Sequence, residues 1–328
     1  MDTISRLTRF IQDVFKTTLD IFLEALQLSP NAQGYVSGSI TELLLKRVLE
    51  RDHGLEVKRI KEKWEGTKHL KHHGDLYFRR PPDGAWYVLE SKGVKSNSER
   101  WHKLYNLANL DKFLTAHSEK IPWVDQAQPA QPQVQVWLRR NLPRMFTDYA
   151  QLLYDYEEVS KYIRNRPKRE TPKSRAIDAL GTLSREEIAR MIDERISYVR
   201  SRVSVLETHL VSGTSASSQR TQATPRKDEF NLLAVDLVLR WHDHKFLFTN
   251  PNLLDPSEDD NNHLQQNYVI GFTFSGDSDE PSLSYTEEWF DNFADAFDTL
   301  DAADAVSEAD MQIDQRLEAD GVGEKALE

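Results

Sequence analysis

The chain has 328 residues, 39% of them apolar, which is enough to bury the core of one large domain or of two modest ones. It contains no cysteine, and this excludes a disulfide framework, a thiol nucleophile and any zinc or iron–sulfur site built on cysteine. No apolar run reaches membrane-spanning length and the N-terminus does not read as a signal peptide, so we expect a soluble, cytoplasmic protein with no membrane partner.

The charge is unevenly distributed along the chain. The formal net charge is −11, but residues 251–328 carry 21 acids and two bases, a net of −19. The first 250 residues therefore carry 40 bases and 32 acids, a net of +8. A basic body indicates a polyanionic partner, and the acidic tail is typical of a solvating or self-masking segment. The alternative is that the uneven charge only aids solubility.

Two helices are predicted before the first strand. Residues 1–35 form an N-terminal region whose apolar side chains recur at helical spacing over 3–28, so we expect one long amphipathic helix that Ser29 and Pro30 end. Core packing is the preferred role of its apolar stripe, and a dimer contact is the alternative. Ser39 and Glu42 form a capping box that predicts a second helix, through about residue 51.

The centre of the chain predicts a hairpin. After a probable first strand near 55–60, two apolar, aromatic-rich runs at 74–78 and 86–93 flank a Pro-Pro-Asp-Gly turn. Side chains alternate along a strand, so Glu90 and Lys92 point to one face. If the two strands pair, Asp75 comes close to that same face.

Two carboxylates and an ammonium at one sheet edge suit metal-assisted hydrolysis of a phosphodiester. Asp75 and Glu90 would repel each other unless a cation lay between them, and carboxylate oxygens are ligands that Mg²⁺ prefers. A divalent ion can activate a water and neutralise charge on a phosphate. Lys92 would then orient or deprotonate that water. The alternative is a surface hairpin with ordinary charges at its ends.

Asp75, followed after fourteen residues by Glu90-Ser91-Lys92, resembles the catalytic signature of the PD-(D/E)xK nuclease superfamily, the fold of many type II restriction endonucleases. The literal Pro-Asp is absent, because Gly74 precedes Asp75. The resemblance implies that Asp75, Glu90 and Lys92 are catalytic. It also implies that Asp75, Glu90 and the Ser91 carbonyl hold Mg²⁺, for which Mn²⁺ can substitute. Glu42 would be a further metal ligand, although the capping box explains it without a metal.

The order of predicted elements agrees with this resemblance. A helix through about residue 117 follows the hairpin, and alternating apolar residues predict a strand over 134–138. Residues 36–140 thus predict an αβββαβ core with a mixed central sheet. The expected fold class is α/β and restriction-endonuclease-like, with added helices and a C-terminal β-rich segment.

The region after this core is predicted in four parts. Residues 141–210 are a helical region with a basic loop, whose helices cover 143–163 and about 184–206, and residues 211–228 are a flexible loop. Residues 229–300 are a β-rich segment with strands at 232–240, 245–248 and 268–274, followed by a short helix at 287–300. Asp236 lies inside the first of these strands and needs a partner, either an arginine or a site. Residues 301–328 are expected to be disordered.

Basic side chains beside the nuclease-like core predict contacts with the DNA backbone. A histidine-rich stretch at 69–73 also invites a zinc site, and the basic loop at 161–175 also suits a solvated linker. The candidate DNA-binding residues are Lys71, His72, His73, Lys95, Arg100, Arg164, Arg166, Lys168 and Arg169.

The expected function is therefore a Mg²⁺-dependent endonuclease that cleaves double-stranded DNA, of the restriction type and acting as a homodimer. One alternative is a repair or structure-specific nuclease, or a subunit of a larger defence complex. The other is a non-catalytic DNA-binding protein on the same fold. Fold alone does not decide among these roles.

Overall fold

The structure is a computed structural model. It describes residues 2–61, 73–95, 107–141, 156–165, 168–171, 174, 178, 180–210, 224–241, 243–275 and 282–314. The chain forms two compact units, and each is interrupted in sequence by the other. Unit 1 comprises Met1–Lys92, Glu229–Leu233 and Asp301–Glu328, and unit 2 comprises Gly93–Asp228 and Ala234–Leu300. The contiguous ranges expected from the sequence do not follow this division.

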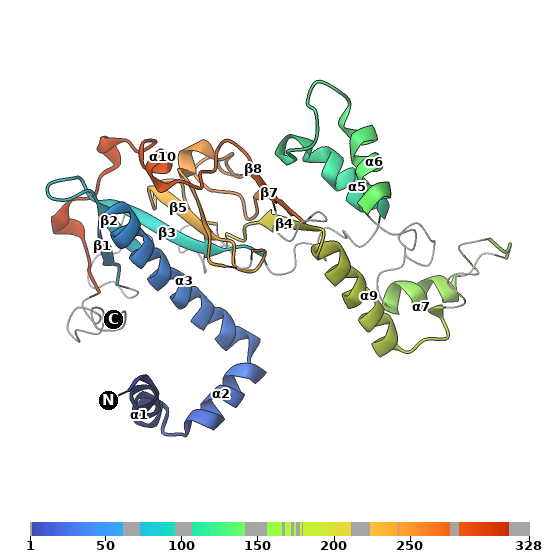
Figure 1. Ribbon diagram of the computed structural model, residues 1–328, viewed down its shortest axis with the longest axis horizontal. Helices are drawn as coiled ribbons and strands as arrows, with labels where there is room; N and C mark the ends of the chain where they lie inside the picture. Colours follow the sequence, from blue (N-terminus) through green and yellow to red (C-terminus); the bar gives the residue numbers. More distant parts are fainter. Residues whose placement is uncertain are drawn as a thin grey trace. The chain divides into compact units, whose positions relative to one another are not determined.

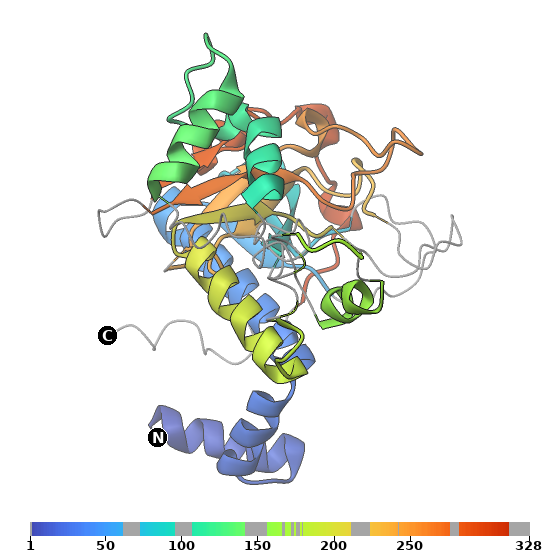
Figure 2. The same ribbon diagram turned by 90° about the vertical axis from the view of Figure 1, so that its right-hand side faces the viewer.

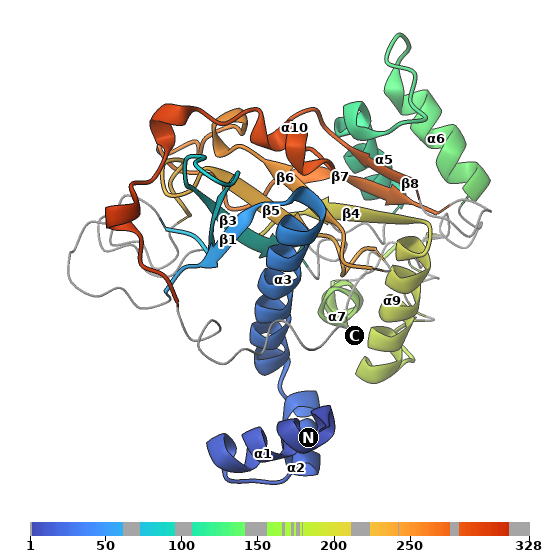
Figure 3. The ribbon, with the colours of Figure 1, turned by 60° about the vertical axis from the view of Figure 1, so that its left-hand side comes forward.

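Three helices open unit 1, where the sequence predicted two. α1 (Thr3–Phe15) ends at Lys16, which takes the left-handed conformation, and α2 (Leu19–Leu28) follows. The predicted long helix over 3–28 is therefore broken in the middle. α3 (Pro30–His53) begins where we expected a stop, because proline is well tolerated in the first turn of a helix. Figure 3 shows α3 leading from the sheet to α2 and α1.

The predicted hairpin is confirmed. β1 (Glu56–Arg59), β2 (Leu76–Arg79) and β3 (Tyr87–Gly93) form successive antiparallel pairs (Figure 1). Leu76 lies opposite Leu89, which fixes the register of the hairpin. The strands are buried at their apolar positions, and the second half of β3 becomes more exposed from Glu90 onward.

The protein is of the mixed α/β class. β5 (Leu232–Asp236) and β6 (Phe246–Thr249) extend the sheet, whose strand order is β1-β2-β3-β5-β6. β5 is buried at every position, as its continuous apolar run indicates. The strand predicted over 134–138 does not contribute to this sheet, because those residues are helical.

Unit 2 has its own apolar core. α5 (Leu107–Ala116) and α6 (Ala130–Asn141) lie side by side (Figure 2). A three-stranded antiparallel sheet has the order β4-β7-β8, formed by Val203–Glu207, Val269–Phe274 and Ser282–Tyr285. Residues from both helices pack with residues of β4 and β7 in one cluster. Trp123 and Trp137 stack in parallel, with ring centroids 5.2 Å apart.

Two further predictions in unit 2 change at their boundaries. Of the helix expected over 143–163, the described part is helical and forms α7 (Tyr156–Arg164). Residues 142–155 lie outside the described part of the chain. The helix expected to reach residue 206 ends earlier, as α9 (Arg185–Arg200), and the chain then enters β4 (Val203–Glu207).

β7 (Val269–Phe274) confirms the strand predicted at 268–274, whereas β8 (Ser282–Tyr285) was not predicted. The helix expected over 287–300 is only α10 (Phe293–Phe297). Most of the loop predicted at 211–228 lies outside the described residues. In the described part of the chain, no helix combines the length and the apolar character needed to cross a bilayer.

Residues 301–314 are part of unit 1 and pack along its hairpin, so the expectation of disorder is wrong for this stretch. Val306 forms a bridge with Trp86, and Ile313 forms one with Ile60. The N–H of Lys61 donates to the carbonyl of Gln312 at 3.0 Å. These backbone contacts add a short strand-like edge to the hairpin, so the acidic residues of this stretch are held beside β1 and β3 rather than free in solvent.

Candidate active site

The hairpin places Asp75 beside the end of β3. The N–H of Asp75 donates to the carbonyl of Leu89 at 3.0 Å, and its Oδ2 accepts the N–H of Ser91 at 2.7 Å. Gly74 allows this close approach, since a Cβ there would lie 2.4 Å from Cγ1 of Val88 and 2.9 Å from the Leu89 carbonyl oxygen. A side chain at this position would push the two strands apart.

Glu90 and Lys92 project from the same face of β3, as the alternation predicted. Their side chains form an ion pair within β3. Both are partly buried, with side-chain exposures of 15% and 28%. The three residues that the sequence singled out thus form one small cluster inside unit 1.

The carboxyl group of Asp75 is the most perturbed group of this cluster. Burial and the negative charge of Glu90 raise its pKa to about 7, although Lys92, the Ser91 N–H and Arg59 act in the opposite direction. Two carboxylates this close disfavour simultaneous ionisation. A divalent cation would relieve this repulsion and keep both groups ionised.

Lys92 remains an ammonium in this environment. Burial would lower its pKa, but the charges of Glu90, Asp75 and Glu42 together raise it above its ordinary value. A lysine with a raised pKa is a poor proton acceptor near neutral pH. Of the two roles considered for Lys92, the structure therefore favours orienting a water and stabilising negative charge over deprotonation.

Glu42 lies on α3 and is held by an arginine. Its Oε2 accepts from Nη2 of Arg59 at 3.0 Å, and Nη1 of the same arginine donates to Oδ2 of Asp314 at 3.2 Å. The capping-box explanation of Glu42 is wrong, because α3 begins nine residues before Ser39. Glu42 is close enough to affect Lys92, but in this arrangement it faces a cation of the protein itself.

The donor set fits a magnesium ion that is bound by few protein ligands. Asp75 and Glu90 supply carboxylate oxygens, and the carbonyl of Ser91, the residue after Glu90, is a further oxygen donor. Mg²⁺ usually keeps several waters and binds through one or two carboxylates and a substrate phosphate. Within the described ranges, no three histidine, aspartate or glutamate side chains come together closely enough to form a complete metal site. A magnesium ion here would therefore depend on water and substrate oxygens.

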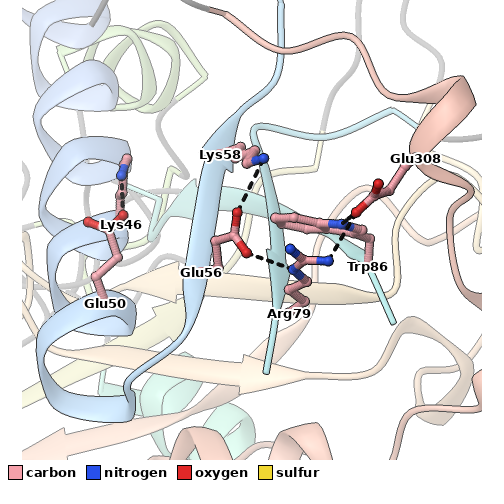
Figure 4. Close-up of polar contacts among 7 residues, drawn as sticks. All are labelled: Lys46, Glu50, Glu56, Lys58, Arg79, Trp86 and Glu308. Atoms are coloured by element: carbon pink, nitrogen blue, oxygen red, sulfur yellow. Dashed lines mark hydrogen bonds and ion pairs between the residues drawn. The ribbon is translucent and has the colours of Figure 1, made fainter. Parts of the chain in front are cut away.

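A second polar cluster lies at the turn end of the hairpin, where β2 ends and β3 begins (Figure 4). Glu308 accepts from Nη1 of Arg79 at 3.0 Å and from the indole N–H of Trp86 at 2.8 Å. Arg79 also bonds to Glu56 at 2.7 Å and lies over the Trp86 ring at 4.5 Å, with Lys58 over the same ring. Glu308 thereby anchors residues 301–314 to the hairpin.

The described candidate DNA-contact residues belong to both units, His73 to unit 1 and the others to unit 2. Lys95 points its ammonium toward Glu207 at 3.8 Å and Asn267 at 3.4 Å and is only 12% exposed, so it is engaged inside unit 2. His73, Arg164, Lys168 and Arg169 are exposed. The remaining candidates, which lie outside the described residues, are Lys71, His72, Arg100 and Arg166.

Asp236 has a specific partner in unit 2. Its Oδ2 lies 2.5 Å from Nδ1 of His244, and its Oδ1 accepts the N–H of Val238 at 3.0 Å. The carboxylate is almost fully buried, with 1% exposure, whereas the imidazole is 32% exposed. The sequence left open an arginine partner or a site for Asp236, and the structure gives it a histidine partner from the turn between β5 and β6.

Sequence reasoning missed Arg59 and Asp314 as neighbours of the candidate site. The poor alternation of β1, with three charged residues in four, was the available signal for Arg59. Asp314 gave no signal, because nothing local in an acidic segment indicates what it docks against.

A scan against protein-family models and searches of curated proteins and of solved structures found no match to this chain.

Proposed function

We propose that this protein is a Mg²⁺-dependent endonuclease that hydrolyses phosphodiester bonds of double-stranded DNA, of the restriction type. The single observation that carries the proposal is the cluster of Asp75, Glu90 and Lys92 at the end of one hairpin, with the pKa of Asp75 raised to about 7. Titratable groups perturbed by both burial and a specific charged neighbour are typical of functional sites. The resemblance to the PD-(D/E)xK superfamily assigns the same three residues.

In this proposal Asp75, Glu90 and the Ser91 carbonyl hold the ion. The ion would supply an activated water and neutralise charge on the scissile phosphate. Lys92, kept protonated by its acidic neighbours, orients that water and stabilises the charge that develops on the phosphate oxygens. The N–H of Ser91 fixes the Asp75 carboxylate, so one oxygen stays directed toward β3.

We further propose that the sheet is a variant of the restriction-endonuclease core. Helix α3 and strands β1 to β3 follow the expected order, and β5 and β6 take the place of the strand expected at 134–138. The resemblance also implies double-stranded DNA as partner and two copies of the chain, one for each strand of the duplex. The basic segment with Arg164, Lys168 and Arg169 is a candidate for backbone contacts.

The test is digestion of plasmid and genomic DNA by purified protein with Mg²⁺ or Mn²⁺ and with EDTA. Asp75→Ala and Lys92→Ala are compared with Asp83→Ala, which changes an exposed acid in the hairpin turn. We expect discrete fragments that require the metal. These fragments should persist with Asp83→Ala and vanish with the other two variants. Cleavage that is unchanged in all variants would refute the assignment.

The alternatives predict other outcomes of the same assay. A repair or structure-specific nuclease, or a subunit of a defence complex, would leave intact duplex uncut and would act on branched or modified DNA or only with its partners. A non-catalytic DNA-binding protein would bind equally in all variants without cutting. The non-catalytic reading is tested as well, because no three acidic or histidine side chains come together at a metal site among the described residues.

A further inference from the structure

Exposed apolar side chains are concentrated at the N-terminal end of unit 1. Of the sixteen large hydrophobic residues that are exposed in the described part of the chain, twelve lie between residues 4 and 43. They are Ile4, Leu7, Phe10, Val14, Phe15, Ile21, Leu23, Leu28, Tyr35, Val36, Ile40 and Leu43. We call α1, α2 and the part of α3 up to Leu43 the N-terminal arm.

The N-terminal arm is ordered but lacks a core of its own. Ile11 is its fully buried apolar residue in α1, and no residue of α2 is buried. Further along α3, Leu45 and Leu49 are fully buried and belong to the core of unit 1. Figures 1 and 3 show the first two helices beyond the far end of α3 from the sheet. An amphipathic helix normally buries its apolar face against another element.

The arm exposes a large apolar area. Ile4 is 63% exposed, Leu28 is 77% and Tyr35 is 82%. Scaled by ordinary side-chain areas, the twelve residues together expose about 1,200 Å² along three helices, and half of this total on one face would already equal the largest apolar patch on a typical monomer, about 300–600 Å². A stable interface buries about 800 Å² on each partner, so the arm supplies enough area for one.

The charge of the arm selects the kind of partner. Residues 3–43, which make up the arm, carry four acids and three bases, a net of −1 within a chain whose net charge is −11. Two arms can therefore meet without the repulsion that the rest of the chain would cause. Nucleic acid or an anionic lipid surface would instead require an excess of bases, which the arm does not have.

We propose that the N-terminal arm is a self-association surface on which the arm of a second copy of this chain packs. A two-fold arrangement brings the same patch of both copies together, so each apolar stripe covers its counterpart. Two copies of α1 and α2 packed in this way bring four helices around a shared apolar core. The proposal is independent of the nuclease chemistry and stands or falls without it.

The test is the mass of the full chain by analytical ultracentrifugation across about 1–100 μM protein. The arm variant is Ile4→Glu with Val14→Glu and Ile21→Glu, which leaves the buried Ile11 in place. The matched control is Leu239→Glu with Leu253→Glu, two residues that are 47% and 44% exposed and lie outside the arm. Circular dichroism at each concentration checks that the helices persist.

The natural chain and the control are expected to sediment as dimers of the 38.0 kDa chain. Self-association of the arm variant should be weakened at least tenfold, with its helical signal retained. A natural chain that stays monomeric at all concentrations, or an arm variant that dimerises like the control, would overturn the proposal. A monomer that instead sediments with phosphatidylcholine vesicles would assign the arm to a lipid surface and would overturn it equally.

Discussion

Replacing Asp75 by asparagine is expected to stabilise the metal-free protein at alkaline pH while removing the proposed metal ligand. Burial and Glu90 raise the pKa of Asp75 from 3.8 to about 7. Between these values the unfolded chain carries an ionised carboxylate, whereas the folded protein holds a proton. Folding therefore takes up a proton, and the contribution of Asp75 to stability falls as the pH rises from about 4 to about 7.

The magnitude follows from the size of this shift. A difference of about 3 pKa units, at about 1.4 kcal/mol each, gives an upper limit of about 4 kcal/mol above pH 7. Asp75 is partly exposed, so solvent screening reduces the expected gain to roughly 2 kcal/mol. Asparagine keeps an oxygen that can accept the Ser91 N–H, so the variant loses the charge and not this hydrogen bond.

Hydrogen exchange of amides in β2 and β3 measures this effect locally, which matters because the two units need not unfold together. In EDTA, Asp75→Asn should slow exchange relative to the natural chain at pH 8, and the difference should shrink as the pH is lowered toward 4. Asp83→Asn is the control in the exposed turn. Faster exchange in Asp75→Asn at pH 8, or a gain independent of pH, would refute the electrostatic account of the site.

Three further predictions concern the elements that support the site. Gly74→Ala should lower the free energy of unfolding, measured in urea, by about 1–3 kcal/mol, because the new Cβ would overlap the Val88 side chain. Gly93→Ala is the control: a Cβ there meets open space, so the free energy of unfolding should change by less than about 0.5 kcal/mol. Asp314→Asn should destabilise unit 1 by about 1–3 kcal/mol by leaving Arg59 less well paired, and an equal loss in the exposed Asp310→Asn would contradict this reasoning. A chain ending at residue 300 should unfold at lower urea than one ending at residue 314, and identical midpoints would show that the docked segment adds no stability.

The hairpin and its charged residues were predictable because their signals are local. The turn sequence, the alternation of β3 and the spacing from Asp75 to Glu90 all act within twenty residues of chain. The helix that replaced the strand at 134–138 shows the opposite case. Val134 and Leu138 are buried and Val136 is 63% exposed, and a spacing of four residues suits one helical face as well as an alternating strand.

Other features could not be predicted because they depend on distant partners. β4 is buried at every position, so its apolar residues extended the stripe of α9 without showing alternation. The acidic composition of residues 301–314 predicted disorder, yet the stretch bonds to Arg59, Arg79 and Trp86. Local composition does not reveal a docking partner more than 200 residues away in sequence.

The return of residues 301–314 to the hairpin has a consequence for how the protein is made. Unit 1 consists of three stretches of chain, and the last of them begins at Asp301, 222 residues after β2 ends at Arg79. At about 5–20 residues per second, a ribosome needs roughly 10–50 seconds to cover this interval. During that time β1 and Arg59 lack their C-terminal partners, and unit 2 is synthesised in between. The environment of Asp75 therefore reaches its final form only after Asp314 has been synthesised and has docked, which delays any activity at this site until then.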